Sequence, residues 1–101
     1  MRTVVNFQFP IEPFNTLVRA GTAGKILAAI LDAIKPEAVY FYAPQGCRGG
    51  TMVVNIDDPA QLPTIVEPFF LTFGAKCDVH MAMSPEDLAK AGLEELGKQW
   101  G

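Results

Sequence analysis

Residues 50–74, GTMVVNIDDPAQLPTIVEPFFLTFG, place a strand, a turn and a helix in direct succession. In residues 52–56 the side chains alternate between two faces, which is typical of a strand. Asp58 suits the N-cap of a helix, and Pro59 suits its first position. We expect Pro68 to kink or restart this helix, because proline has no backbone N–H for the helical hydrogen bond. The rest of the chain is expected to pack around this strand and helix.

Three further segments show the alternation of a strand, at residues 3–9, 38–43 and 77–83. The glycine-rich segment 44–50 separates two strands, which predicts a long hairpin turn. It does not match the phosphate-binding pattern G-x-x-x-x-G-K-S/T, and it leads into a strand instead of a helix. A phosphate site is therefore the weaker interpretation of this segment.

Helical spacing of apolar residues appears at residues 14–21 and again at residues 25–34. Two glycines separate these segments and predict a break, with Thr22 as a candidate N-cap of the second helix. Ser84 and Asp87 resemble a capping box at the start of a last helix, which is expected to reach about residue 98. The apolar stripe of this last helix consists of Ala89, Leu93, Leu96 and Trp100.

The predicted order is β-α-β-β-α-β with an extra C-terminal helix, which is the ferredoxin-like arrangement of the α+β class. We expect one domain over residues 1–101, with a four-stranded antiparallel sheet and the helices on one of its faces. The strand residues expected to face the helices are apolar: Val5, Phe7, Phe9, Val39, Phe41, Met52, Val54, Ile56, Val79 and Met81.

The opposite, open face of the sheet is predicted to be mixed in character. A face that combines aromatic, apolar and amide groups is rarely left to water, because exposed apolar patches usually mark contact sites. We therefore predict a homodimer in which two open faces pack together and bury roughly 1,200 Å² or more. The predicted members of this face are Val4, Asn6, Gln8, Tyr40, Tyr42, Val53, Asn55, Asp78 and His80.

Composition excludes several classes of partner. The eight basic residues are scattered and the net charge is −3, so the chain lacks the basic patch of a nucleic-acid-binding protein. No apolar run approaches the ~20 residues of a membrane span. The first ten residues lack the pattern of a signal peptide, and we expect a cytoplasmic protein with no membrane association. In that compartment Cys47 and Cys77, 30 residues apart, are expected to be free thiols.

Four segments resemble a group of small bacterial proteins of unassigned function: IKPEA at 34–38, DP at 58–59, EPFFL at 67–71 and PEDLAKA at 85–91. This resemblance covers most of residues 34–91. The predicted order of strands and helices resembles more widely the dimeric α+β barrel families, in which two ferredoxin-like subunits close a barrel. It implies a fold and a homodimer more than an activity. That superfamily is similar in shape to muconolactone isomerases, small cofactor-free monooxygenases and stress-responsive barrel proteins. No active-site motif of those enzymes matches this chain, and none is carried over.

His80 is the only histidine, and Asp78 lies two residues away on the same predicted strand face. A carboxylate that orients an imidazole suits acid–base catalysis, which makes this pair the candidate catalytic residues. The alternative interpretation is a hydrogen-bonded structural pair at the sheet edge or in a dimer interface. Most polar pairs are structural, and the sequence favours this alternative.

Five polar residues of the open face are candidates for binding a small molecule. Amides and phenols orient ligands in pockets that are otherwise apolar. The same residues also suit a wet dimer interface, in which tyrosine is enriched. The candidates are Asn6, Gln8, Tyr40, Tyr42 and Asn55.

No metal site and no cofactor are expected, since one histidine and two separated cysteines do not form a ligand set. Cys47 follows a glycine and precedes Arg48, whose charge would favour a reactive thiolate, although no other motif supports that role. The leading interpretation is a homodimeric binding or structural module, with a small-molecule cavity on the open face. The alternative is a cofactor-independent isomerase or monooxygenase for a small cyclic or aromatic substrate, with His80 as acid or base.

Overall fold

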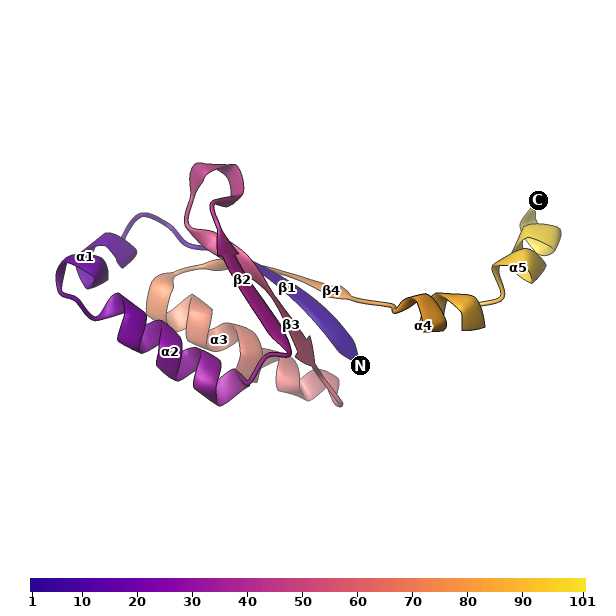
Figure 1. Cartoon of the computed structure of the whole chain (residues 1–101), viewed down its shortest axis with the longest axis horizontal. Helices are drawn as coiled ribbons and strands as arrows, with labels where there is room; N and C mark the ends of the chain where they lie inside the picture. The colour runs from indigo at the N-terminus through magenta and orange to yellow at the C-terminus, as the bar shows by residue number, and fades with distance from the viewer.

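The computed structural model describes all residues, 1–101. Its centre is a four-stranded sheet in the order β2-β3-β1-β4, and every neighbouring pair of strands is antiparallel (Figure 1). The predicted α+β class and antiparallel sheet are therefore confirmed. The strands are β1 (Arg2–Gln8), β2 (Ala38–Tyr42), β3 (Gly49–Asn55) and β4 (Lys76–Met81).

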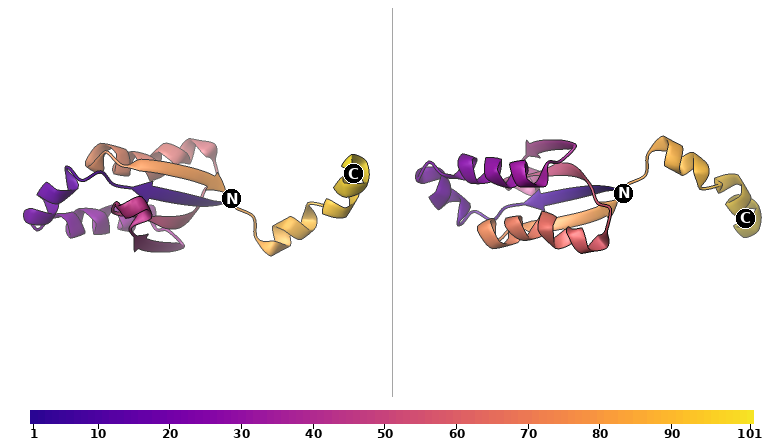
Figure 2. Two further views of the ribbon diagram at one scale, coloured as in Figure 1. Left: turned by 90° about the horizontal axis from the view of Figure 1, so that it is seen from above. Right: turned by 90° about the horizontal axis from the view of Figure 1, so that it is seen from below.

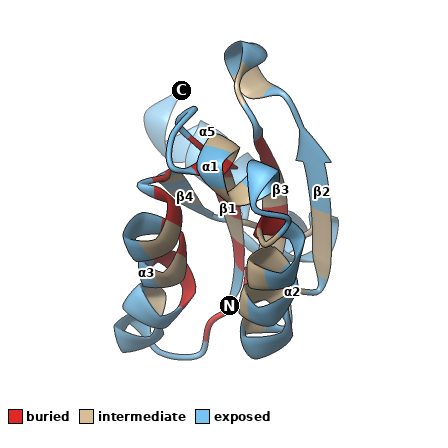
Figure 3. Cartoon of the chain, turned by 90° about the vertical axis from the view of Figure 1, so that its left-hand side faces the viewer, coloured by how far each residue is buried: buried red, intermediate tan, exposed pale blue.

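The main helices cover one face of this sheet and leave the other face open (Figure 3). Short 3-10 turns follow β2 and β3, and two helices extend the chain beyond β4. No helix is long and apolar enough to cross a lipid bilayer. The helices are α1 (Phe14–Arg19), α2 (Ala23–Ile34), η1 (Pro44–Gly46), η2 (Pro59–Gln61), α3 (Leu62–Phe73), α4 (Pro85–Lys90) and α5 (Leu93–Trp100).

The core lies between the sheet and the helices α1, α2 and α3, and α3 supplies its largest buried helical side chains. Phe7 of β1 and Phe69 of α3 are fully buried, with their ring centroids 5.0 Å apart. Each such buried side chain contributes roughly 1.5–3 kcal/mol relative to an exposed one. Val5 and Met52, which face each other across β1 and β3, are also fully buried. The alternation of β1 and β3 thus predicted the buried face correctly.

Two residues of the predicted helix-facing set are not covered. Phe41 is 52% exposed and Met81 is 73% exposed. Both belong to the edge strands, β2 and β4, whose other helix-facing residues, Val39 and Val79, are only partly buried against the core. The alternation assigned Phe41 and Met81 to the correct face of the sheet. It does not contain the position of each strand in the sheet, which affects how far a residue is covered.

All three predicted residues occupy N-cap positions, and two of them make capping hydrogen bonds with their side chains. Asp58 Oδ1 accepts a hydrogen bond from the Ala60 N–H at 2.9 Å. Ser84 and Asp87 form the expected capping box, in which the Asp87 N–H donates to Ser84 Oγ at 3.1 Å. The hydrogen bonds from Ser84 hold the pKa of the Asp87 carboxyl below its ordinary value. Thr22 occupies the predicted N-cap position of α2, but its side chain makes no capping hydrogen bond; its hydroxyl donates to the Leu17 carbonyl at 3.3 Å.

Of the two outcomes expected at Pro68, a kink or a restart, the restart does not occur. α3 runs without interruption from Leu62 to Phe73 and contains Pro68. Ile65 and Phe69 are buried on the two sides of the proline, so the packed face holds the helix across the missing hydrogen bond.

The last helix is divided, where a single helix was expected. Gly92 has a φ of 71°, a left-handed conformation that ends α4 and precedes α5. Residues 84–101, here called the C-terminal arm, extend away from the sheet and its helices (Figures 1 and 2). The molecule measures 59 × 28 × 19 Å, and its radius of gyration is 17.0 Å. A compact chain of this length has a radius of about 13 Å, so the arm accounts for the elongated shape.

Candidate functional site

The open face of the sheet brings most of the predicted site residues onto one surface. Asn6 of β1 lies opposite Asp78 of β4 on one side and opposite Thr51 of β3 on the other. Thr51 in turn lies opposite Tyr40 of the edge strand β2. One row across the sheet therefore carries a carboxylate, an amide, a hydroxyl and a phenol.

The next row along the sheet contains Gln8, which lies opposite Lys76 of β4 and Gly49 of β3. Gly49 in turn lies opposite Tyr42 of β2. Gly49 has no side chain, and the Pro44 ring fills the space beside it, 2.7 Å from the position that a Cβ would take.

A short hydrogen-bonded chain links three strands on this face. Thr51 Oγ1 donates to Asn6 Oδ1 at 2.7 Å. The Tyr42 hydroxyl is hydrogen-bonded to the same Thr51 oxygen. A threonine hydroxyl has one proton, which Thr51 gives to Asn6, so Tyr42 is the donor in the second bond. The sequence prediction omitted Thr51, although its position on the open face was visible from the alternation of β3.

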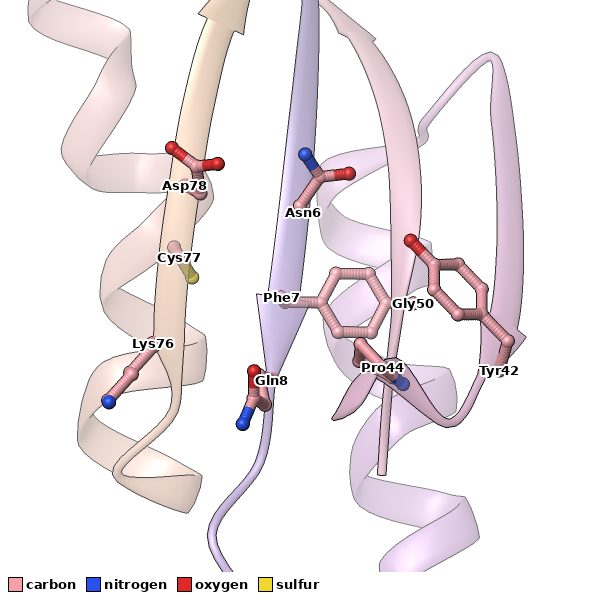
Figure 4. Close-up of a pocket in the computed structure, with 9 residues that line it drawn as sticks. All are labelled: Asn6, Phe7, Gln8, Tyr42, Pro44, Gly50, Lys76, Cys77 and Asp78. Carbon is pink, nitrogen blue, oxygen red and sulfur yellow. The ribbon is translucent and has the colours of Figure 1, made fainter. Parts of the chain in front are cut away.

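A hollow of about 240 Å³ opens at this part of the face (Figure 4), and we call it the polar hollow. Four of the predicted residues line it: Asn6, Gln8, Tyr42 and Asp78. Lys76 adds an ammonium group that the sequence prediction did not include. The other lining residues are Phe7, Pro44, Gly50 and Cys77.

Three predicted site residues do not line the polar hollow. Tyr40 lies on the same face and is 70% exposed. Asn55 lies at the far end of β3, where its Oδ1 accepts a hydrogen bond from the Met1 amino group at 2.7 Å. His80 lies opposite Val4, one row beyond the hollow. Strand position alone could not separate these residues from those that line the hollow.

His80 and Asp78 form the predicted pair. His80 Nε2 lies 2.8 Å from Asp78 Oδ2, which is a hydrogen-bond distance. Both side chains are exposed on the edge strand β4. A carboxylate at this distance orients the imidazole, and this geometry suits either acid–base catalysis or a structural pair.

The two cysteines differ in their surroundings. Cys77 is half-buried beside the polar hollow, and burial raises the pKa of its thiol to about 11. Cys47 lies in the loop between β2 and β3, where Arg48 places its guanidinium over the Phe14 ring, 4.7 Å from the centroid. Both thiols are free, as predicted.

The chain contains no cluster of three or more histidine, cysteine or acidic side chains that could hold a metal ion. No protein-family model matches the chain, and no curated protein matches it. The interpretation of the open face therefore depends on its own geometry. That geometry offers amides, a phenol, an ammonium and a carboxylate around one half-open hollow.

Proposed function

We propose that the protein is a ferredoxin-like homodimer of the cytoplasm whose open sheet faces pack together, each around a polar hollow that binds a small polar molecule. The strand order β2-β3-β1-β4, with helices on one face, supports this fold assignment. The observation that carries the proposal is Tyr40, which is 70% exposed at the middle of an uncovered edge strand. Burying such rings against a second face removes much of their apolar area from water.

A second copy would also complete the polar hollow. In one chain the hollow is open to solvent, and ligand pockets bury most of the surface of what they bind. A facing copy supplies the missing wall. The Asn6 and Gln8 amides then orient the ligand, while Lys76 and Asp78 offer opposite charges at one rim. This arrangement suits a small ring-bearing molecule with both donor and acceptor groups.

The proposal is tested by comparing the dimer dissociation constants of two variants. Tyr40→Asp places an unpaired charge in the desolvated interface, which costs several kcal/mol and weakens the dimer at least ~100-fold. Leu71→Asp is the matched control, since Leu71 is 82% exposed on the outer side of α3, away from the open face. Equal dissociation constants for the two variants would contradict the open-face dimer.

A second candidate function rests on the 2.8 Å hydrogen bond between His80 and Asp78. Under this alternative the protein is a cofactor-independent isomerase or monooxygenase, with His80 as acid or base and Asp78 as its orienting carboxylate. Asp78 also lines the polar hollow, where a substrate would lie. A screen of small aromatic lactones and quinols tests it. Turnover that His80→Gln lowers at least ~100-fold supports the enzyme, and turnover unaffected by that variant opposes it.

A further inference from the structure

The C-terminal arm carries an apolar stripe that its own chain leaves uncovered. Leu93, Leu96 and Trp100 are spaced to lie on one side of α5, and all are exposed, Trp100 by 78%. Isolated helices shorter than about 12–15 residues are marginal in water, so α5, with eight residues, needs a packing partner to persist. The opposite side of the arm is polar and acidic, with Glu94 and Glu95 in the first turn of α5.

A second, larger hollow lies on the helix side of the sheet, at the end of the β2–β3 hairpin. It measures about 530 Å³ and is mostly apolar, and we call it the aromatic hollow. Phe9, Phe14, Leu27 and Phe41 supply its apolar lining, and Arg48 brings a positive charge to it. Half of the Phe41 surface is exposed there, as is typical of an unoccupied contact site.

The arm and the aromatic hollow are complementary. The arm carries an exposed aromatic side chain and a negative charge, and the hollow has an apolar lining and a positive charge. Binding hot spots are enriched in tryptophan, tyrosine and arginine that lie in well-packed pockets. Arg48 lies over the Phe14 ring at 4.7 Å and is also placed to meet an aromatic ring or a carboxylate from outside. The arm offers both groups, with Trp100 on its stripe and four carboxylates against two lysines along residues 84–101.

The arm cannot easily reach the aromatic hollow of its own chain. It leaves the sheet at the Arg2 end of β1, where the Ala82 N–H donates to the Arg2 carbonyl at 3.0 Å. The hollow lies beyond the other end of β1, at Phe9, roughly 23 Å away at ~3.3 Å per residue. The arm also follows β4, whereas the hollow borders β2, and these are the two opposite edges of the sheet. An intramolecular contact would require the arm to span both the length and the width of the sheet.

We propose that the arm of one copy of this chain docks on a second copy, with Trp100 inserted in the partner's aromatic hollow. Reciprocal exchange of two arms gives a closed two-fold dimer. The aromatic hollow lies on the opposite side of the sheet from the open face. The arm contact is therefore independent of the open-face packing proposed above, and either contact can exist without the other.

A cross-linking experiment uses the native Cys47, which lines the aromatic hollow. Leu96→Cys places a thiol one turn from Trp100, and Cys77→Ser removes the other native cysteine. Under mild oxidation we expect a covalent dimer that contains a disulfide between positions 47 and 96, identified by peptide mass spectrometry. Leu71→Cys in the same background is the matched control, because Leu71 is exposed on α3, and its yield of a disulfide to position 47 should be at least ~10-fold lower.

A monomer with an internal disulfide between positions 47 and 96 would show that the arm docks on its own chain and would overturn the proposal. A yield equal to that of the Leu71→Cys control would also overturn it, because the arm would then be free. Fluorescence of the intact chain gives a second measurement, since Trp100 is the only tryptophan. Its emission should move to longer wavelength on dilution, and a maximum that is independent of concentration would contradict docking on a second copy.

A double-variant comparison separates this contact from the open-face dimer. Dimer dissociation constants are measured for Tyr40→Asp, for Trp100→Asp and for the two combined, in the full chain. The arm contact predicts that Trp100→Asp weakens association at least ~10-fold even when Tyr40→Asp is present, and no change there overturns it. The open-face proposal fails instead if Tyr40→Asp has no effect when Trp100→Asp is present.

Discussion

Thr51 Oγ1 donates a hydrogen bond to Asn6 Oδ1 at 2.7 Å and thereby joins β3 to β1 across the open face of the sheet. The same oxygen is bonded to the Tyr42 hydroxyl on β2. A single hydroxyl thus positions an amide and a phenol that line the polar hollow. The geometry of the hollow depends on this residue.

Replacing Thr51 with valine keeps the shape of the side chain and removes both hydrogen bonds. We expect Thr51→Val to lower the free energy of unfolding by about 1–2 kcal/mol, because each bond contributes roughly 0.5–1.5 kcal/mol. Urea unfolding measures this loss. Thr64→Val is the control, since Thr64 is exposed on α3, and it should change stability by less than about 0.5 kcal/mol. Equal effects of the two variants would show that the chain of hydrogen bonds contributes nothing.

Gly50 lies on β3 where a side chain has no room. A Cβ there would collide with the Tyr40 carbonyl oxygen and with the Phe7 ring. We expect Gly50→Ala to lower the free energy of unfolding by about 1–3 kcal/mol, because the buried ring and the neighbouring strand must move apart. Thermal unfolding followed by circular dichroism checks this expectation.

Replacing Gly24 with alanine should have the opposite effect on thermal unfolding. It lies in α2 with nothing within 4 Å of the position of its missing Cβ. Alanine is the better helix former by about 0.5–1 kcal/mol, so Gly24→Ala should stabilise the protein. If both glycine variants shifted the unfolding temperature in the same direction, this account of β3 packing would be wrong.

The Cys77 thiol should react much more slowly than that of Cys47. Burial raises the pKa of Cys77 from 9.0 to about 11. At pH 8 the Cys77 side chain therefore contains about 100-fold less thiolate than a thiol with the ordinary pKa of 9.0. Alkylation with iodoacetamide, followed by peptide mass spectrometry, measures the two rates in the folded protein. Comparable rates at pH 8, with denatured protein as the reference, would contradict the burial of Cys77.

The same pKa shift sets a pH dependence of stability. The pKa of the Cys77 thiol is 9.0 in the unfolded chain and about 11 in the folded protein, so folding favours the neutral thiol. The contribution of this shift to the free energy of unfolding is fully present below pH 9 and is lost as the pH rises through about 11. Cys77→Ser should abolish this part of the alkaline loss. A urea midpoint measured between pH 8 and pH 11 tests the direction, and an identical pH profile in the variant would exclude Cys77 as its source.

The alternation of apolar residues predicted the strands and the buried face well, because side-chain direction in a strand follows from local geometry. Val5 and Phe7 are buried as expected. Phe41 and Met81 were placed on the correct side, but strand order, which the alternation does not contain, leaves them uncovered. Local sequence patterns also did not predict that α3 continues through Pro68, because the buried side chains of Ile65 and Phe69 maintain the helix there.

The candidate site was predicted only in part for a similar reason. Asn6, Gln8, Tyr42 and Asp78 meet at the polar hollow, as their shared face suggested. The row of each residue depends on the pairing register, which brings Lys76 to the hollow and leaves His80 one row beyond it. Thr51 was overlooked because a lone threonine in a strand has no distinctive signal in the sequence. The separation of α4 from α5 had a visible cause in Gly92, although one glycine within a helical pattern is often tolerated.

The measurement that tests the central claim most directly is the solution mass of the Trp100→Asp chain by light scattering, with and without Tyr40→Asp. In this background the arm contact is weakened, so the open face is the principal remaining interface. We predict twice the 11.0 kDa of one chain without Tyr40→Asp, and 11.0 kDa with it. A mass of 11.0 kDa in both proteins, or of a dimer in both, would contradict the packing of two open faces through Tyr40.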